Sequence, residues 1–468
     1  MEKFRLSENI DPNKVFIVNR SELEGRIDPN FYKTVNKNIV NKIKKNNFYT
    51  IKDIVRFSSE TWDQKSIFDS EFPYIEISNI DLSDGTIKDV KLIGVKEAPS
   101  RAKMIVRKND IIISTTRPTR GAISIQKNSS IQIASTGFSV IREINEKLFL
   151  REALFHILRL SFVSIQMGQR SSGGNYPAIT QEELGRIVIP AISLSIQEKI
   201  NNIYNKAYTE KQQKEAEAQK LLDSIDDYLL GELGITLPKE EECLQQTTNK
   251  HNSYNLDNDN PLVKKGRLFL TNLSEVTGKR WSAFEFKNRN LKLEDGDYPN
   301  KTLKHLAHLL KGQSITSNEI EKGNYPVIAG GQISPYTHNQ YNFKGNVITI
   351  SASGAYSGYV WYHNYPIFAS DCTVIFSKEE SEITTLYLSE ILKLKQKEIY
   401  NLQQGAGQPH VYARDLERIN IPIPPLQKQN EIATHISQIR NKANALKQEG
   451  KEILEQAKQE VEQMILGN

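Results

Sequence analysis

The feature that most constrains the fold of this chain is an internal repeat. The eleven residues that begin at Phe16 match those that begin at Phe269, with Phe, Asn, Ser, Glu and Gly coinciding at an offset of 253. Near the end of each half, residues 184–190 match residues 416–422 at an offset of 232. Ordered matches of this density indicate that two related halves follow each other in one chain.

The middle of each half carries the same repeat in weaker form. The β-rich run at residues 111–114 resembles residues 347–350, and the Ala-Ser pair at residue 134 matches the one at residue 369. Short apolar runs of this kind alternate with helical patterns in both halves. Each half is therefore predicted to contain a mixed α/β domain.

Each half ends in a segment with the spacing of a long helix. Apolar residues recur at steps of three and four from Ile200 to Tyr228, and again from Ile432 to Met464, over roughly four to five heptads. Two equal helices in one chain each need to bury an apolar stripe, so we predict that they pair antiparallel with each other. The alternatives are solvated surface helices, or helices that pair with other proteins.

The apolar stripe is interrupted in both helices. Lys211 and Lys214 interrupt the first stripe, and the second is interrupted by two residues, Gly450 and Glu460. In an antiparallel pair the start of the second helix meets the far end of the first. We therefore expect two residues near that start, Ile436 and Ile439, to pack against the end of the first helix.

These patterns define the fold class and the domain boundaries. We predict an α+β fold with a pseudo-twofold internal repeat, in which two tandem mixed α/β domains are joined by two long antiparallel coiled-coil helices. The segment rich in Gln, Asn, Thr and Asp between the halves has the composition of a linker. The predicted segments are 1–192 (first domain), 193–237 (first long helix), 238–261 (polar linker), 262–424 (second domain) and 425–468 (second long helix).

Composition excludes several classes of protein. No run approaches the ~18 consecutive apolar residues of a membrane span, and Met1 is not followed by the apolar stretch of a secretory signal. The two cysteines, Cys243 and Cys372, cannot form a disulfide framework, so a cytoplasmic location is expected. The net charge of +5 is only mildly basic.

The sequence carries no recognisable catalytic or cofactor motif. Residues 28–31, Asp-Pro-Asn-Phe, superficially resemble the Asp/Asn-Pro-Pro-aromatic motif of amino-methyltransferases, but they lack the second proline and are expected to form a turn. No phosphate-binding G-x-x-x-x-G-K-[ST] motif is present. His305 and His308 lack a nearby Glu or Cys cluster that would complete a metal site. We therefore predict that the chain is not an enzyme and binds no cofactor or metal.

Two pairs of polar loops have the chemistry of a nucleic-acid interface. Residues 114–121 correspond to residues 351–359, and residues 169–176 correspond to residues 403–412. Arginine suits guanine, Asn and Gln suit adenine, and hydroxyls suit phosphates or base edges. Ordinary polar turns are the alternative, but the occurrence of the loops in both halves favours binding. The predicted contacts are Ser114, Thr115, Thr116, Arg117, Arg120, Gln169, Arg170, Asn175, Ser351, Ser353, Tyr356, Tyr359, Gln403, Gln404, Gln408 and His410.

Arg117 is the strongest of these candidates. It lies in a Ser/Thr-rich loop at the predicted end of a strand, and Pro118 follows it. Residues before proline favour extended conformations, which would project the guanidinium outward to grip a guanine. The alternative is a salt bridge from Arg117 to a nearby carboxylate. For Arg120, whose neighbour is Gly121, contact with a phosphate is slightly favoured.

The motifs together resemble the specificity (S) subunit of type I restriction–modification systems, over essentially the whole chain. They are the repeated Ile-x-Ile-Pro, the run Pro-Pro-Leu-Gln-Lys-Gln-Asn-Glu-Ile at residues 424–432, the long helix after each, and the turn and strand at residues 321–331. The first half departs from this pattern, with Pro-Ala-Ile-Ser-Leu at residues 190–194 where Pro-x-Pro-Pro-Leu is usual.

The resemblance implies a role in a larger complex. Two target-recognition domains would read the two parts of an asymmetric double-stranded DNA target separated by a fixed unread spacer. Two methyltransferase (modification) subunits would dock on the helices, and restriction (translocase) subunits would attach to them. These partners would bind S-adenosylmethionine, ATP and Mg and would supply much of the phosphate contact, which the modest net charge permits.

Two other interpretations remain open. The chain could be the recognition part of a fused single-chain restriction enzyme, although it contains no catalytic module. It could also be a coiled-coil scaffold whose repeats bind protein. Tests of DNA binding with and without a methyltransferase partner distinguish the three.

Overall fold

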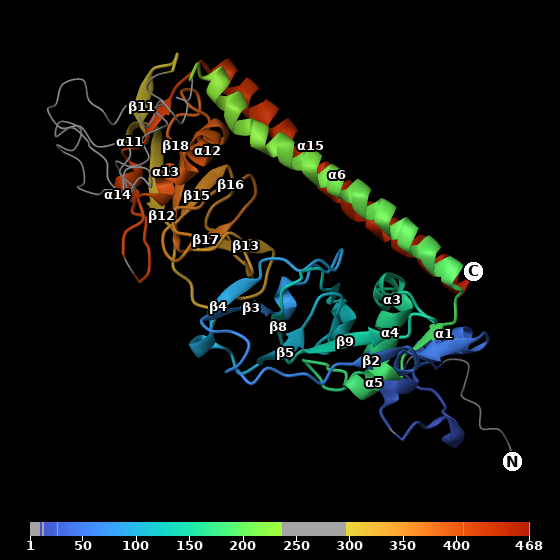
Figure 1. The fold of residues 1–468 in the computed structure, drawn as a ribbon. Helices are drawn as coiled ribbons and strands as arrows, with labels where there is room; N and C mark the ends of the chain where they lie inside the picture. The colour runs from blue at the N-terminus through green and yellow to red at the C-terminus, as the bar shows by residue number, and fades with distance from the viewer. Residues whose placement is uncertain (1–9, 12–13, 26, 236–295, 406, 468) are drawn as a thin grey trace, which may run out of the picture. The chain divides into compact units, whose positions relative to one another are not determined.

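The structure is a computed structural model that describes residues 10–11, 14–25, 27–235, 296–405 and 407–467. The chain divides into two compact units (Figure 1). Unit 1 comprises residues 1–217 and 445–468, and unit 2 comprises residues 218–444. The predicted linker at 238–261 and the repeat match that begins at Phe269 lie outside the described residues.

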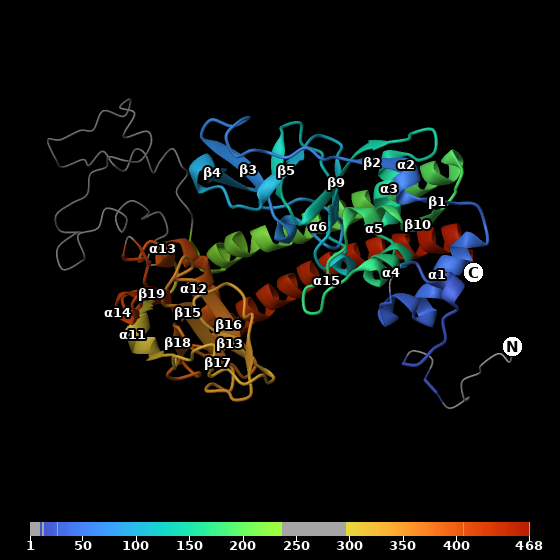
Figure 2. The same cartoon turned by 90° about the horizontal axis from the view of Figure 1, so that it is seen from below.

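Unit 1 consists of short strands and helices followed by one end of each long helix (Figure 2). Its strands are β1 (Phe48–Thr50), β2 (Val55–Phe57), β3 (Glu71–Ile75), β4 (Lys91–Gly94), β5 (Ala102–Val106), β6 (Ile111–Ser114), β7 (Ile123–Ile125), β8 (Gln132–Ser135), β9 (Phe138–Ile144) and β10 (Val188–Pro190). Its short helices are α1 (Thr34–Lys44), α2 (Ile51–Ile54), α3 (Arg151–Leu158), α4 (Ser161–Arg170) and α5 (Gln181–Gly185), with the 3-10 turns η1 (Arg20–Glu22), η2 (Pro29–Tyr32), η3 (Ile77–Asn79), η4 (Val95–Glu97) and η5 (Pro118–Arg120).

Unit 2 is built from the same kinds of element. Its strands are β11 (Asn300–Thr302), β12 (Ala307–Lys311), β13 (Tyr325–Ile328), β14 (Thr337–His338), β15 (Val347–Ser351), β16 (Val360–His363), β17 (Phe368–Ala369), β18 (Cys372–Ser377) and β19 (Asn420–Pro422). Its short helices are α11 (Leu303–Leu306), α12 (Thr385–Leu394), α13 (Gln396–Tyr400) and α14 (Ala413–Leu416).

The sheet order confirms the internal repeat. Unit 1 has an antiparallel sheet β2-β9-β6-β7, a second sheet β4-β3-β8-β5 in which β3 and β8 are parallel, and an antiparallel pair β1-β10. Unit 2 has the corresponding sheet β12-β18-β15-β16, a sheet β14-β13-β17 in which β13 and β17 are parallel, and the pair β11-β19. Among the described residues, the second sheet of unit 2 contains no strand that corresponds to β5.

The repeat can be aligned by hydrogen bonds as well as by sequence. The Ser114 N–H donates to the carbonyl of Ala122, and the Ser351 N–H donates to the carbonyl of Tyr359. β6 therefore corresponds to β15 at an offset of 237, one residue away from the alignment suggested by sequence. Every residue in both strands is buried, so neither shows the polar alternation that would have set the register.

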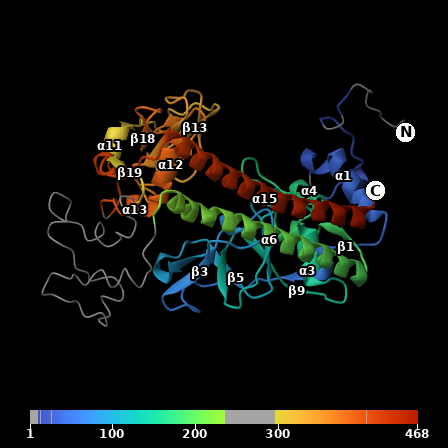
Figure 3. The same ribbon diagram turned by 90° about the horizontal axis from the view of Figure 1, so that it is seen from above.

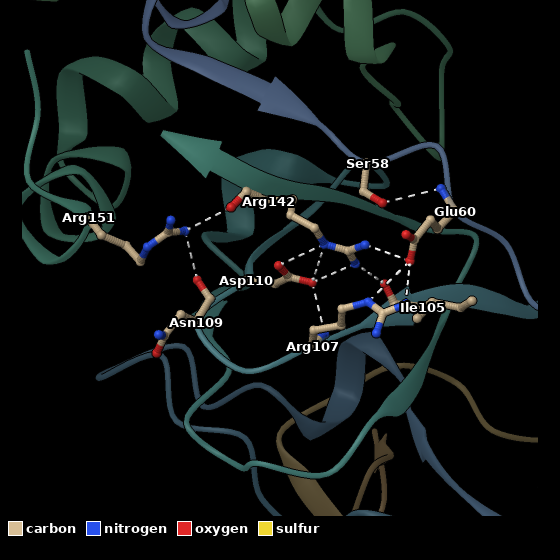
Figure 4. Close-up of polar contacts among 8 residues, drawn as sticks. All are labelled: Ser58, Glu60, Ile105, Arg107, Asn109, Asp110, Arg142 and Arg151. Carbon is tan, nitrogen blue, oxygen red and sulfur yellow. Dashed lines mark hydrogen bonds and ion pairs between the residues drawn. The ribbon is translucent and has the colours of Figure 1, made fainter. Parts of the chain in front are cut away.

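An ion cluster links the two four-stranded sheets of unit 1 (Figure 4). The Arg142 guanidinium on β9 donates to the buried carboxylate of Asp110 and, at 3.0 Å, to the carbonyl of Ile105 on β5. It also pairs at 2.6 Å with Glu60, which pairs with Arg107 as well. Hydrogen bonds from Arg142 and then Arg107 hold the pKa of Glu60 below its ordinary value. The cluster thus joins side chains and backbone of both sheets.

The two long helices are the predicted coiled-coil segments. The first, α6 (Leu194–Glu232), has 39 residues, and the second, α15 (Leu426–Leu466), has 41. At about 1.5 Å per residue each is roughly 60 Å long. They lie side by side in Figures 1 and 3.

The contacts within each unit confirm the antiparallel pairing. In unit 1, Ala207 of α6 forms a buried cluster with Leu454 and Ala457 near the end of α15. In unit 2, Ile225 near the end of α6 belongs to the same buried core as Ile436 near the start of α15.

The expected contacts of Ile436 and Ile439 with the end of α6 are of two kinds. Ile436 is completely buried in the core of unit 2, and Ile439 packs against its side. At the other end of α15 the predicted seam is wrong. Glu460 and Met464 are exposed, and Val461 is buried instead, because the step from Ala457 is four residues.

Lys211, which interrupts the apolar stripe of the first helix, attaches that helix to the domain of unit 1. The side chain is 5% exposed, and its ammonium lies 2.6 Å from Asp84, which is equally buried in the loop before β4. A Cβ on Gly450 would lie 3.3 Å from the Lys211 Cγ, so the missing side chain there makes room for the lysine stem. Lys214 instead pairs with Glu449 at the partly exposed edge of the helix pair.

A buried glutamine attaches the start of each long helix to its domain. The Gln197 amide accepts from the Leu150 N–H at 2.6 Å and donates to the carbonyls of Leu148 and Ile192. Gln429 repeats this arrangement in unit 2. These contacts account for the match between Gln197 and Gln429 at an offset of 232.

The unit 2 bonds run to equivalent positions. Gln429 accepts from the Thr384 N–H at 2.9 Å and donates to the carbonyls of Glu382 and Pro424. Both glutamines are completely buried. Each therefore satisfies three backbone groups at the point where a domain ends and a helix begins.

Candidate nucleic-acid interface

The two predicted loops of each half lie against each other. In unit 1 an isolated bridge pairs Thr116 in the loop after β6 with Ala178 in the loop before α5. In unit 2 the equivalent bridge pairs Ser353 with His410. The paired loops are called the loop pair of each unit below. Segments about sixty residues apart in sequence thus form one continuous surface in each unit.

A glycine at the same position shapes the second loop of each pair. Gly173 has φ +99° and Gly405 has φ +100°, a region that disfavours residues with a Cβ. A Cβ on Gly405 would lie 2.8 Å from the carbonyl oxygen of Gln408, and one on Gly173 would lie 3.2 Å from that of Tyr176. The positive φ and the close approach of the backbone therefore favour glycine at this one position of each loop.

The backbone of Arg117 is left-handed, with φ 49° and ψ 52°, and the prediction of an extended conformation is wrong. Its N–H donates to the carbonyl of Pro177 at 2.7 Å, and Pro118 begins the turn η5 immediately afterwards. At the equivalent position of unit 2, Gly354 has φ +87° and donates to Pro409 at 3.0 Å. Contact between the two loops therefore overrides the local preference set by the proline.

The Arg117 side chain is held by the second loop. Its guanidinium carbon lies 4.3 Å from the centre of the Tyr176 ring, and its Nη2 donates to the Asn175 carbonyl at 3.2 Å. No carboxylate pairs with Arg117 among the described residues, so the alternative of a salt bridge is not supported. Arg120 is exposed. Both guanidiniums thus bring positive charge to the loop pair of unit 1.

Two predicted serines are buried and do not reach the surface. Ser114 is 1% exposed and donates to the Thr116 carbonyl at 2.7 Å. Ser351 is 3% exposed and donates to the Ala329 carbonyl at 3.2 Å. Both are the last residues of central strands, β6 and β15, so the prediction that they contact nucleic acid is wrong.

Gln169 and Arg170 are also buried. They fall in the last turn of α4 and not in the loop. Gln169 donates to the Phe31 carbonyl at 2.7 Å, and Arg170 pairs with Glu183 at 2.9 Å. The first contact attaches η2, which covers most of the turn predicted at residues 28–31, to α4, and the second attaches α5. The expectation that Gln169 and Arg170 bind nucleic acid is therefore wrong.

The other predicted residues of unit 1 line the surface of its loop pair. Thr115 and Thr116 are half-buried, and the Thr115 hydroxyl donates to the Gly137 carbonyl at 3.0 Å. Asn175 is exposed. Tyr176, which is 69% exposed, was missed, although a lone aromatic residue in a glycine-rich loop is itself a signal of a contact surface.

The predicted residues of unit 2 are more engaged with the protein. Gln403 donates to the Ser357 carbonyl at 2.7 Å, and Gln404 donates to the Asp415 carboxylate at 2.6 Å. Ser353 donates to the carboxylate of Asp371. Side chains in the loop pair of unit 2 therefore bond to neighbouring carboxylates, whereas no carboxylate pairs with Arg117 among the described residues of unit 1.

Exposed groups also remain in the loop pair of unit 2. Gln408 is exposed, and Tyr356 is 48% exposed. Tyr359 is half-buried, and His410 lies against Tyr412 with 6.1 Å between ring centres. Tyr412, a second residue missed from sequence, is 43% exposed. The rings offer stacking surfaces, and the Arg414 guanidinium carbon lies 5.0 Å from the centre of the Tyr412 ring.

The described residues contain neither a metal-binding cluster nor a membrane-spanning helix. They contain no group of three or more His, Cys, Asp or Glu side chains that could hold a metal ion. His305 contacts the Thr302 hydroxyl at 2.7 Å, and His308 lies 5.0 Å from the Phe376 ring, so the two histidines do not converge. In the same part of the chain, no helix is long and apolar enough to cross a bilayer.

The chain is similar to several known proteins. A putative type I specificity subunit of Mycoplasma pneumoniae is 26% identical over 139 residues, 28% of this chain and 44% of the relative. The MjaVIII specificity subunit of Methanocaldococcus jannaschii is 27% identical over 140 residues, 28% and 32% of the two chains. The HindI specificity subunit of Haemophilus influenzae is 27% identical over 158 residues, 33% of each. These matches span less than half the length of each relative.

Solved structures resemble the chain over a longer range. The HsdS subunit from Thermoanaerobacter tengcongensis aligns over 90% of this chain and 96% of its own, with 21% identity and a TM-score of 0.36. A type I S subunit from M. genitalium aligns over 89% and 95%, with 13% identity and a TM-score of 0.41.

The family comparison covers both halves. The sequence matches the family described as type I restriction modification DNA specificity domain at residues 43–221 and again at residues 295–456. Each match includes one loop pair and most of one long helix. The two matches together cover well over half of the chain. The chain therefore belongs to the family of type I restriction modification DNA specificity domains.

Proposed function

We propose that this chain is the non-catalytic DNA-recognition subunit of a type I restriction–modification complex. The observation that carries the proposal is the loop pair, which has the same backbone bridges in both units but different side chains. A shared frame with different chemistry suits two readers of different base sequences. The target is then asymmetric and bipartite, with a spacer that neither unit reads.

The proposal assigns the catalytic chemistry to partners. Two modification subunits bind the helices, transfer methyl groups from S-adenosylmethionine to adenine, and recruit restriction subunits that use ATP and Mg. The specificity-subunit names of the similar proteins support this assignment. A DNA substrate places the complex in the cytoplasm.

Methylome sequencing of the host with and without this gene tests the proposal. We expect one asymmetric bipartite motif to lose its adenine methylation when the gene is removed. An unchanged methylome would contradict the function.

A second experiment separates the two rival functions. The chain is purified with and without the methyltransferase encoded beside it, and sequence-specific DNA binding, methylation and cleavage are measured for both preparations. A recognition subunit requires the partner for methylation, whereas a fused restriction enzyme acts alone. A protein-binding scaffold binds no specific DNA in either preparation.

A further inference from the structure

We propose that Tyr176 is a positioning residue that holds the Arg117 guanidinium ready to read a guanine in the half-site of unit 1. The inference rests on the proposed function and deepens it. It assigns one base and a supporting residue to the loop pair of unit 1. Three observations lead to it: a strained backbone, a paired difference between the units, and a guanidinium that pairs with no carboxylate among the described residues.

The backbone position favours glycine, and unit 1 has an arginine there. Arg117 and Gly354 occupy equivalent left-handed positions, each donating its N–H to a proline of the second loop. A residue with a long side chain is strained in this region, whereas glycine is not. Strain retained at a surface loop points to a use for the side chain that causes it.

The supporting residue differs between the units in the same way. Because Pro177 corresponds to Pro409, the equivalent of Tyr176 is Gln408. At these two positions unit 1 has the arginine and the aromatic ring, whereas unit 2 has Gly354 and Gln408. A functional pair requires that the arginine and the tyrosine occur together or are replaced together. Neither side chain is needed for the backbone of the loop pair, since unit 2 forms the same bridges without them.

The contact leaves the guanidinium suited to bidentate binding. The Arg117 guanidinium carbon lies over the Tyr176 ring, 4.3 Å from its centre, and the Asn175 carbonyl accepts one N–H from Nη2. Arginine has five N–H donors in one plane, so the remaining in-plane donors have no protein acceptor among the described residues. Guanine presents O6 and N7 side by side in the major groove, which matches such a pair of donors.

The test uses the full chain in complex with the modification subunits, on the target identified by methylome sequencing. Competition binding measures the affinity for every single-base variant of the half-site. Arg117→Gly is expected to lose roughly 5- to 150-fold discrimination at one G·C pair. Tyr176→Ala is expected to lose about two- to fivefold at the same pair, and Tyr176→Phe to retain it. Tyr336→Ala, a similarly exposed tyrosine in unit 2, is expected to leave this half-site unchanged.

Two further measurements separate positioning from folding. Arg117→Gly removes backbone strain, so its melting temperature is expected to equal or exceed that of the wild type while specificity is lost. The double variant with Tyr176→Ala is expected to discriminate no worse than Arg117→Gly alone, because the tyrosine acts through the arginine.

Distinct outcomes overturn distinct statements. If Tyr176→Ala keeps the wild-type preference at every position, or weakens binding to all sequences equally, the positioning role is wrong while the proposed function stands. If the wild-type complex shows no base preference at all, the proposed function fails and this inference fails with it.

Discussion

The buried ion pair between Lys211 and Asp84 allows a quantitative test of how the domain of unit 1 is attached to the first long helix. Each side chain is 5% exposed, and the two charges lie 2.6 Å apart. Lys211→Met keeps an unbranched stem beside Gly450 but leaves the Asp84 carboxylate buried without its cation. Loss of one partner of a buried pair costs about 3–5 kcal/mol. We expect the lower end, about 3 kcal/mol, because Thr86 still donates two hydrogen bonds to Asp84.

Hydrogen exchange of the full chain measures this cost where it occurs. A loss of about 3 kcal/mol corresponds to roughly 100-fold faster exchange in the loop before β4 and in the facing part of α6. The matched control is Lys214→Met, which removes a partly exposed pair on the same helix and is expected to leave the exchange rates close to those of the wild type, because solvent screens that pair. Equal exchange in Lys211→Met and Lys214→Met would refute the reasoning.

The same pair predicts a pH dependence. Burial alone would raise the pKa of Asp84, but hydrogen bonds from Lys211 and Thr86 outweigh it and lower the pKa below 3.8. Burial alone would lower the pKa of Lys211, but hydrogen bonds to Asp84 and Glu215 raise it above 10.5. The ion pair therefore stabilises the fold fully between pH 3.8 and pH 10.5. This stabilisation is lost as the pH falls through the folded pKa of Asp84, and also as the pH rises through the folded pKa of Lys211. Lys211→Met should flatten both limbs in urea unfolding.

Three other variants test separate parts of the molecule. Changing Ile436 and Ile439 together to Asp places charge in the helix seam at a cost of several kcal/mol, so assembly with the modification subunits should be lost in co-purification; normal assembly would contradict the scaffold role. Arg120→Ala should weaken binding to all DNA sequences alike and reduce the salt slope by about one unit if the residue contacts phosphate, and a change in base preference would contradict that role. Deletion of residues 1–260 should yield a chain that must dimerise and then methylates a palindromic version of the second half-site, and methylation of the original asymmetric motif would contradict the two-reader arrangement.

The periodic features of the fold could be predicted from sequence, because their causes are local. Heptad spacing predicted both long helices and the burial of Ile436. The heptad spacing was wrong at Met464, because the buried residue after Ala457 is Val461, four residues later, and not a residue three positions later. The register of β6 against β15 was missed by one residue because uniformly buried strands carry no alternation.

The candidate site was only partly predictable, because its geometry depends on contacts distant in sequence. The two polar segments of each half do meet, but Ser114, Ser351, Gln169 and Arg170 belong to strands and a helix. Arg117 is left-handed because a carbonyl some sixty residues away accepts its N–H. Gln169 and Arg170 are buried because η2, far earlier in the chain, covers the end of α4. Tyr176 could have been chosen from sequence, because it is an aromatic residue in a glycine-rich loop. Its contact with Arg117 could not have been predicted from sequence.

The joints at Gln197 and Gln429 are made of neutral amides, whereas the proposed contacts with DNA are made by charges. Affinity for DNA falls steeply with salt because bound counterions must be released, but an amide bonded to backbone groups has no such dependence. A rise in ionic strength therefore lowers the affinity for DNA, while the hydrogen bonds between each helix and its domain are unchanged. The protein can thus dissociate from one DNA site and bind another while its helices and domains stay joined.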